Sequence, residues 1–378
     1  MSHGYLLLED GRRFDGRLCG AEGQALGEVV FTTSMSGYQE SVSDPSFAGQ
    51  ILAFTLPHVG NYGVSAEAME SDRIHTPAVV MHTGMNGEQA PAAEAGWLDW
   101  LRDCGIVAID EVDTRSLVRH IRGAGSMRGG VFARTTSERD ALDEVRSSPV
   151  MSGQDLASTV TRDSMVELAP LGEGPQLRIA MIDTGVKDSI VRKLRERGAT
   201  LELHPCSVSP EQLLAGDADA FFLANGPGDP AALDGVVSTV RAVLGTKPVY
   251  GICLGHQLLC RAVGLETWKL PFGHRGANHP VKDLTTGRVE ITSQNHGFAV
   301  LGPGGSGTVE VDEPVRWDTD FGEAALTHVN LYDRTVEGLA LPEARAATVQ
   351  YHPEAGPGPH DAEHLFDRFI AEIAEAAA

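Results

Sequence analysis

Apolar and polar positions follow two different patterns along the chain, and the second half carries the simpler one. From residue 177 onward, short apolar runs alternate with segments whose apolar positions recur at helical spacing. Strands are expected at residues 178–183, 200–204, 218–224 and 247–252, and helices at 187–197, 231–244 and in the stretch that ends at Gly264. This alternation predicts an α/β fold with a doubly wound, mostly parallel sheet, whose reactive groups gather at the carboxyl ends of the strands.

The first half instead carries short strand-like runs separated by turns rich in glycine and proline. Strands are expected at residues 27–33, 50–56 and 106–110, and helices from Asp113 or Thr114 to Gly123 and over residues 137–147. Residues 151–176 show no clear periodicity. We therefore predict a mixed α+β domain over residues 1–150, a linker over 151–176 and the α/β domain over 177–378.

A cysteine between two glycines lies where the strand expected at 247–252 passes into a helix. Gly251 and Gly255 flank Cys253, and glycines on both sides let neighbouring backbone approach a residue held in a strained turn. The partial positive charge at a helix N-terminus favours the thiolate, which is the form that attacks. The pattern predicts a nucleophile, and a small buried core cysteine is the alternative.

A thiolate nucleophile needs a base that accepts and returns a proton, and a group that orients this base. His352 and Glu354 are separated by one residue, so their side chains project to the same side if the chain is extended there. These two residues are the candidate base and the candidate orienting acid.

The developing negative charge on the substrate also requires backbone N–H donors. Leu254 directly follows the nucleophile and supplies one donor by its position. The loop at residues 225–230 follows another expected strand and can face the same crevice. Gly228 is the preferred second donor of this oxyanion hole, with Gly226 as a conformational hinge.

Composition limits the classes of function. The chain has 378 residues and a formal net charge of −22, which argues against binding to nucleic acids or anionic membranes. Five cysteines without regular spacing favour a reducing compartment. The apolar run near the start is too short for a signal peptide, and no later run approaches a membrane span. A cytoplasmic protein is expected.

Around Cys253, His352 and Glu354 the chain resembles the class I, triad-type glutamine amidotransferases. Over nearly its full length it resembles the small, glutamine-hydrolysing subunits of carbamoyl-phosphate synthetases. The segments that carry these resemblances are 225–230, 251–257, 8–11, 34–40, 44–46, 57–61, 273–281 and 294–298. The run from Asp183 to Lys187 departs from the family's usual pattern only at tolerant positions.

The resemblance implies a role for each matching residue. Cys253 would be the nucleophile, His352 the base and Glu354 its orienting partner. The groups that would bind L-glutamine are those of Ser46, Gly226, Gly228, Leu254, Gln257, Asn295, Gly297 and Phe298. Ser46 would come from the N-terminal domain, which would place the site near the boundary between the domains.

The reaction implied by the resemblance releases ammonia from glutamine and delivers it to a large synthetase subunit. That partner would make carbamoyl phosphate from bicarbonate and ATP, for arginine biosynthesis, pyrimidine biosynthesis or both. No Walker-type phosphate loop occurs here. We therefore expect no cofactor or metal in this chain, and ATP with Mg in the large subunit.

Other interpretations remain open from the sequence. Another class I glutamine amidotransferase or a free-standing thiol amidase could use the same triad, although neither needs the N-terminal half. A non-catalytic α/β interaction protein is the third alternative. The run from His360 to His364 matches His-x-x-Glu-His of some zinc peptidases, but its acidic residues also suit a helix N-terminus, which we favour. Cys260 is expected in the core.

Overall fold

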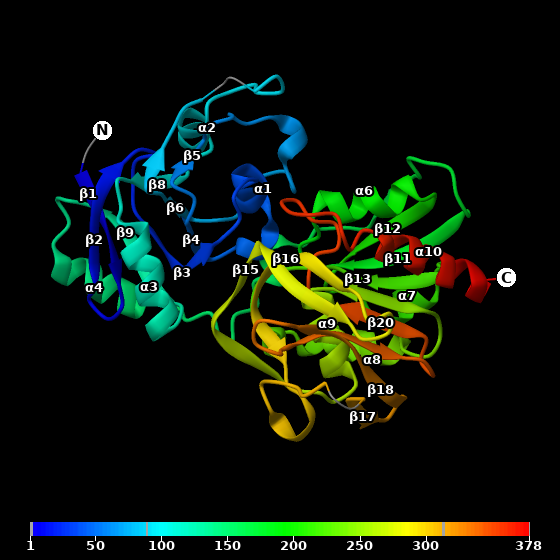
Figure 1. The fold of residues 1–378 in the computed structure, drawn as a ribbon. Helices are drawn as coiled ribbons and strands as arrows, with labels where there is room; N and C mark the ends of the chain where they lie inside the picture. The colour runs from blue at the N-terminus through cyan, green and yellow to red at the C-terminus, as the bar shows by residue number, and fades with distance from the viewer. Residues whose placement is uncertain (1–2, 88–89, 312–313, 378) are drawn as a thin grey trace. The chain divides into compact units, whose positions relative to one another are not determined.

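The computed structural model describes residues 3–87, 90–311 and 314–377. The chain forms two compact units, both drawn in Figure 1. The first unit comprises Met1–Gln154, Pro271–Gly276 and Gly356–Gly358. The second comprises Asp155–Leu270, Ala277–Ala355 and Pro359–Ala378. Within the described residues, no helix combines the length and the apolar character needed to cross a bilayer.

Strands of the first unit close into a barrel, in the order β1-β2-β8-β6-β4-β3-β9. Their bounds are β1 His3–Leu8, β2 Arg13–Leu18, β3 Ala25–Thr32, β4 Gln50–Phe54, β6 Ala78–Val80, β8 Val107–Asp110 and β9 Met127–Ala133. The barrel closes because β1 pairs with both β2 and β9. Alternate apolar side chains such as Leu6, Val29, Ile51 and Ile109 fill a buried core.

Short elements complete the first unit. They are α1 Tyr38–Ser43, η1 Pro45–Phe47, β5 His58–Val59, η2 Ala66–Ala68, β7 Thr83–Gly84, α2 Trp97–Asp103, α3 Thr114–Ala124 and α4 Glu138–Ser147. Asp113 caps α3 through the amide of Ser116, and Ser137 caps α4 through the amide of Asp140. Helix α3 runs to Ala124 and is capped by Gly125, two residues beyond the Gly123 expected to end it, because Gly125 takes the positive φ.

One large sheet organises the second unit, in the order β10-β12-β11-β13-β14-β20-β19-β18-β15-β16, with β17 paired to β18. The strands are β10 Val166–Leu168, β11 Leu177–Asp183, β12 Ala199–Pro205, β13 Ala220–Leu223, β14 Val249–Ile252, β15 Thr267–Asp283, β16 Val289–Val300, β17 Arg316–Thr319, β18 Gly322–Asn330, β19 Val336–Leu341 and β20 Ala346–Val349. Pairing is parallel from β12 to β20 through β11, β13 and β14. The α/β fold class is therefore confirmed.

Helices cover both faces of this sheet. They are α5 Ala157–Val160, α6 Asp188–Glu196, α7 Pro210–Leu214, α8 Asp234–Val243, α9 Leu254–Ala262 and α10 His364–Ala377, with 3-10 turns η3 Pro230–Ala232 and η4 Pro303–Gly305. Side chains of β11 alternate between two cores. Ala180 and Ile182 pack with α8 and α9, whereas Ile179 and Met181 pack with α6 and α10.

Two local differences from the sequence pattern have simple causes. The helix expected over residues 231–244 is split, because Asp229 caps the 3-10 turn η3 and Leu233 then leaves helical geometry. The stretch 151–176, which shows no periodicity, contains α5 and the strand β10. Strand β10 pairs antiparallel with β12, but three residues are too few to show an alternating pattern.

Candidate active site

The turn between β14 and α9 holds Cys253 in a strained conformation. Its backbone has φ 56° and ψ −106°, a region that side chains other than glycine rarely adopt. Such strain costs about 1–3 kcal/mol and persists only where the surrounding structure enforces it. The side chain is 2% exposed, and its Sγ donates to the backbone carbonyl of Asn295 at 3.6 Å. The strand-turn-helix elbow expected from the sequence is present.

Close packing explains the two glycines beside this cysteine. A Cβ on Gly255 would lie 2.2 Å from the carbonyl oxygen of Leu223, on the neighbouring strand β13. A Cβ on Gly251 would lie 3.0 Å from the backbone of Gly255. Any larger residue at these positions would push α9 away from the sheet.

His352 and Glu354 form a buried pair just beyond β20. The Nδ1 of His352 lies 2.6 Å from Oε1 of Glu354, and the two residues are 3% and 2% exposed. The backbone N–H of His352 donates to the carbonyl of Ser293 at 2.9 Å, and the N–H of Ala355 donates back to the carbonyl of His352 at 3.2 Å. His352 and Glu354 therefore meet within a turn, and not in the extended segment that the sequence pattern predicted. Because Glu354 engages Nδ1, Nε2 is the ring nitrogen left to exchange a proton with a nucleophile.

Lys187 is a third charged group in this corner, and the sequence pattern assigned it no role. Its side chain is buried, and Nζ lies 3.1 Å from Oε1 of Glu354 and 2.7 Å from the carbonyl of Ala355. Lys187 precedes α6, and its backbone N–H donates to Oδ1 of Asn225 at 3.1 Å. A partner 167 residues distant along the chain leaves no local signal in a single sequence.

The electrostatics of this corner shift two pKa values in opposite directions. Burial alone would raise the pKa of Glu354, but the charges of Lys187 and then of His352 lower it to about 2. Burial alone would lower the pKa of His352, but the negative charge of Glu354, its hydrogen bond to the ring and the neighbouring Cys253 raise it to about 10. Glu354 therefore stays ionised, and His352 holds a proton firmly once it has accepted one.

The glycine loop after β13 lies beside the elbow, as expected from the sheet. Strands β13 and β14 are parallel neighbours, so their carboxyl ends are adjacent. A Cβ on Gly226 would lie 3.0 Å from Cδ2 of Leu254 and 2.1 Å from the carbonyl of Thr184. Gly228 adopts φ 95°. Leu254 is the first residue of α9, where helices leave their N–H groups without intrahelical partners.

Residues expected to bind glutamine are distributed over both units. Asn295, Gly297 and Phe298 lie on β16, and Asn295 and Phe298 are buried. Gln257 lies on α9, and its amide Nε2 donates to the carbonyl of Phe298 at 2.8 Å and to Gln350 at 3.0 Å. This side chain therefore ties α9 to β16. Ser46 belongs to the first unit, in η1, and its role in glutamine binding stays a prediction.

Other candidate side chains have partners that suit structural roles. Cys260 is fully buried on α9, and burial raises the pKa of its thiol. His364 begins α10, and its Nε2 lies 2.6 Å from Oε1 of Glu290. Glu363 lies 2.7 Å from Nζ of Lys193. The acidic residue and the second histidine of the His-x-x-Glu-His run thus take part in separate ion pairs.

Comparison with known proteins agrees with the two halves seen in the sequence. Residues 6–131 match the family model of the carbamoyl-phosphate synthase small chain, CPSase domain. Residues 180–372 match the model of the class I glutamine amidotransferases.

Similar proteins extend over nearly the whole chain. A carbamoyl phosphate synthase small chain of Streptomyces avermitilis is 44% identical, over 97% of this chain and 94% of that protein. Proteins of the same name from Mycobacterium tuberculosis and Akkermansia muciniphila are 43% and 42% identical, over 99% and 98% of this chain and 99% and 97% of those proteins. The chain therefore belongs to the family of carbamoyl phosphate synthase small chains, with a class I glutamine amidotransferase domain.

Proposed function

We propose that this chain hydrolyses L-glutamine with Cys253, His352 and Glu354, and passes the ammonia to a large synthetase chain. That partner would use the ammonia, bicarbonate and ATP to make carbamoyl phosphate, for arginine or pyrimidine biosynthesis. ATP and Mg would be bound by the partner. The observation that carries the proposal is the buried pair of His352 and Glu354, 2.6 Å apart, together with the strained Cys253.

The chemistry divides into two acyl transfers. In the first, His352 takes the proton of Cys253, and Sγ attacks the side-chain amide carbon of glutamine. The carbon–nitrogen bond breaks, the proton on His352 passes to the departing nitrogen, and ammonia leaves a thioester. In the second, His352 takes a proton from water, the oxygen attacks the thioester carbon, and glutamate leaves while Sγ regains a proton.

Each neighbouring group stabilises a defined species in these steps. Lys187 keeps the carboxylate of Glu354 ionised, and this carboxylate lies against Nδ1 of His352. Its negative charge favours the imidazolium that forms when the thiol is deprotonated. The N–H groups of Leu254 and Gly228 would stabilise the negative oxygen of both tetrahedral intermediates. Burial of the site excludes bulk water, so these charges act at short range in a low dielectric.

Replacement of the nucleophile tests this proposal. We expect Cys253→Ser to lower glutamine hydrolysis by the purified chain about 10³-fold or more, measured as glutamate release. Cys104→Ser is the matched control, because it removes an exposed thiol of the first unit and should leave the rate unchanged. In complex with a large synthetase chain, Cys253→Ser should retain synthesis from added ammonia and lose synthesis from glutamine.

The outcomes separate the alternatives. Glutamine hydrolysis that survives in Cys253→Ser contradicts the triad, whereas a wild-type chain that hydrolyses no glutamine, alone or in complex, favours a non-catalytic role. Full hydrolysis without any complex at micromolar concentration favours a free-standing amidase. A complex that transfers nitrogen from glutamine to a product other than carbamoyl phosphate favours a different amidotransferase.

A further inference from the structure

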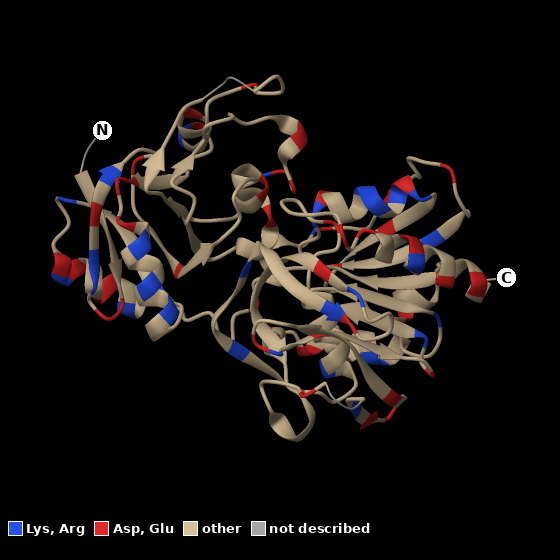
Figure 2. Cartoon of the chain, in the orientation of Figure 1, with Lys and Arg blue, Asp and Glu red and all other residues tan. Residues whose placement is uncertain are grey.

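One exposed face of helix α3 carries a row of arginines. Arg115, Arg119 and Arg122 are spaced at i, i+4 and i+7, so they lie on one side of the helix. All three side chains are exposed. Figure 2 shows bands of Lys and Arg along this helix. In a chain with a formal net charge of −22, this face is a local concentration of positive charge.

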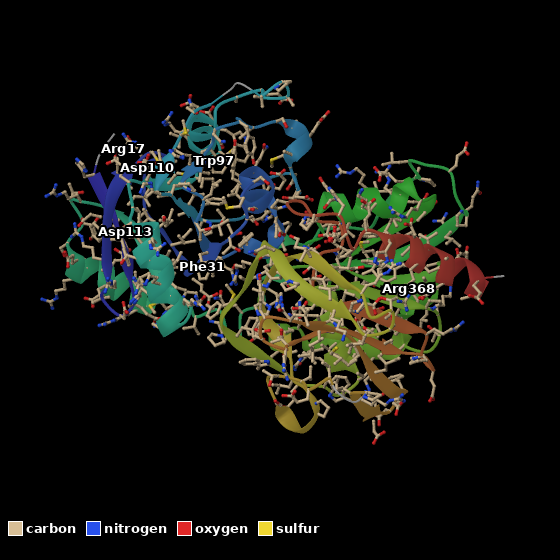
Figure 3. The ribbon with its side chains drawn as sticks, in the orientation of Figure 1. Arg17, Phe31, Trp97, Asp110, Asp113 and Arg368 are labelled. Carbon is tan, nitrogen blue, oxygen red and sulfur yellow. The ribbon has the colours of Figure 1, made fainter. Side chains whose placement is uncertain are left out.

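The acidic groups near this face are occupied elsewhere. Asp113, labelled in Figure 3, accepts from the amide of Ser116 at 2.9 Å and caps the helix. Asp10 lies 2.6 Å from Nε2 of His120. Among the described residues, none of the three arginines has a carboxylate within ion-pair distance.

Two other helices pair an arginine with an acidic residue about one turn away. Arg102 lies 2.7 Å from Asp99 on α2, and Arg368 lies 2.7 Å from Glu372 on α10. On α3, by contrast, like charges are placed one turn apart, which disfavours a helix. Arg115 also lies in a first turn that contains no acidic residue, although a cation there opposes the helix dipole. Arg122 suits the last turn of the helix, but Arg115 and Arg119 have no ion pair among the described residues and remain available to a partner.

The surface beside the arginines is hollowed on two sides. One hollow of about 480 Å³ is lined by Thr55, Thr114, Arg115, Val118, Arg119 and Arg122. A second of about 470 Å³ is lined by Arg12, Asp113, Arg115, Ser116, Arg119 and His120. Arg115 and Arg119 border both hollows. The row spans two helical turns, about 10 Å, which exceeds the size of one small anion and suits a segment with several carboxylates.

We propose that the face formed by Arg115, Arg119 and Arg122 docks an acidic segment of the large synthetase chain. The inference rests on the proposed function for the identity of that partner. Guanidinium groups bind carboxylates in a bidentate manner and are weakly hydrated, so they suit a protein interface. The row of guanidinium groups is complementary in charge to carboxylates, and the large synthetase chain is the protein partner that the proposed function supplies.

Charge reversal on two faces tests the docking site. The variant Arg115→Glu/Arg119→Glu is compared with Arg134→Glu/Arg139→Glu, which makes the same change of charge at exposed arginines outside α3. We expect the α3 variant to weaken binding of the large chain about tenfold or more, and the control less than threefold, in titrations at two salt concentrations. Glutamine hydrolysis by each free chain should equal that of the wild type.

Each outcome bears on one proposal. An α3 variant that binds the large chain as the wild type does overturns the docking site, and so does equal weakening by both variants. A variant that binds a single-stranded RNA less well than the wild type, with binding of the large chain unchanged, also overturns it. A wild-type chain without glutamine hydrolysis contradicts the proposed function but leaves the docking result interpretable.

Discussion

Lys187 and the arginines of α3 are cations in opposite situations. Lys187 is 2% exposed and lies against the carboxylate of Glu354 and the carbonyl of Ala355. Arg115, Arg119 and Arg122 are exposed and have no carboxylate within ion-pair distance among the described residues. A buried charge must be neutralised within the fold, because removing it from water is costly. An exposed charge stays solvated at little cost and remains available for a partner.

Loss of the buried cation should therefore have the larger effect on stability. In Lys187→Met, Glu354 remains as a buried charge with one partner fewer, and we expect the free energy of unfolding to fall by about 3–5 kcal/mol. Arg119→Ala is the matched control on the exposed face and should change it by less than about 0.5 kcal/mol. Urea denaturation of the two variants measures both values.

A double variant separates the charge pair from simple packing. Lys187→Met/Glu354→Gln removes both charges, so its loss of stability should be smaller than the sum of the two single losses. Strict additivity would show that Lys187 acts through its aliphatic chain and not through its charge.

The same comparison explains which parts of the candidate site could be predicted from the sequence. The elbow at Cys253 and the pair of His352 and Glu354 are each local, so spacing and glycine positions were sufficient to indicate them. Lys187 meets Glu354 only because α6 and the segment after β20 are brought together by the sheet. No periodicity within a single sequence records such a contact.

The fold shows the same limit. The parallel strands β11, β13 and β14 are mainly apolar runs between helices, β12 alternates apolar and polar residues, and both patterns indicate strands. Strand β10 has three residues, and β15 to β19 form an antiparallel extension for which the sequence pattern made no assignment. Those strands depend on pairing with segments that are distant along the chain.

Acid should remove part of the stability that the buried charges of Lys187, His352 and Glu354 supply. The pKa of Glu354 is 4.5 in an ordinary setting and about 2 here, because the lowering by Lys187 and His352 exceeds the raising by burial. A lowered pKa in the folded state stabilises the fold above pH 4.5, and this stability is lost as the pH falls from 4.5 toward 2. The free energy of unfolding is to be measured from pH 6 to pH 2.5. Over this range it should fall less steeply in Glu354→Gln than in the wild type. If the free energies of unfolding of the two proteins fall in parallel with pH, the lowered pKa of Glu354 is contradicted.

The smallest expected effect belongs to a single arginine of the exposed face. Arg122→Ala should weaken binding of the large chain only about two- to fivefold, because one exposed charge contributes little and is screened by salt. The effect should be largest at low ionic strength and should disappear near 1 M salt, where the Debye length is about 3 Å. Arg139→Ala on α4 is the matched control and should show no change at either salt concentration. A loss of binding in Arg122→Ala that persists at high salt would mean that this side chain packs within the interface, like the buried Lys187, instead of acting through its charge.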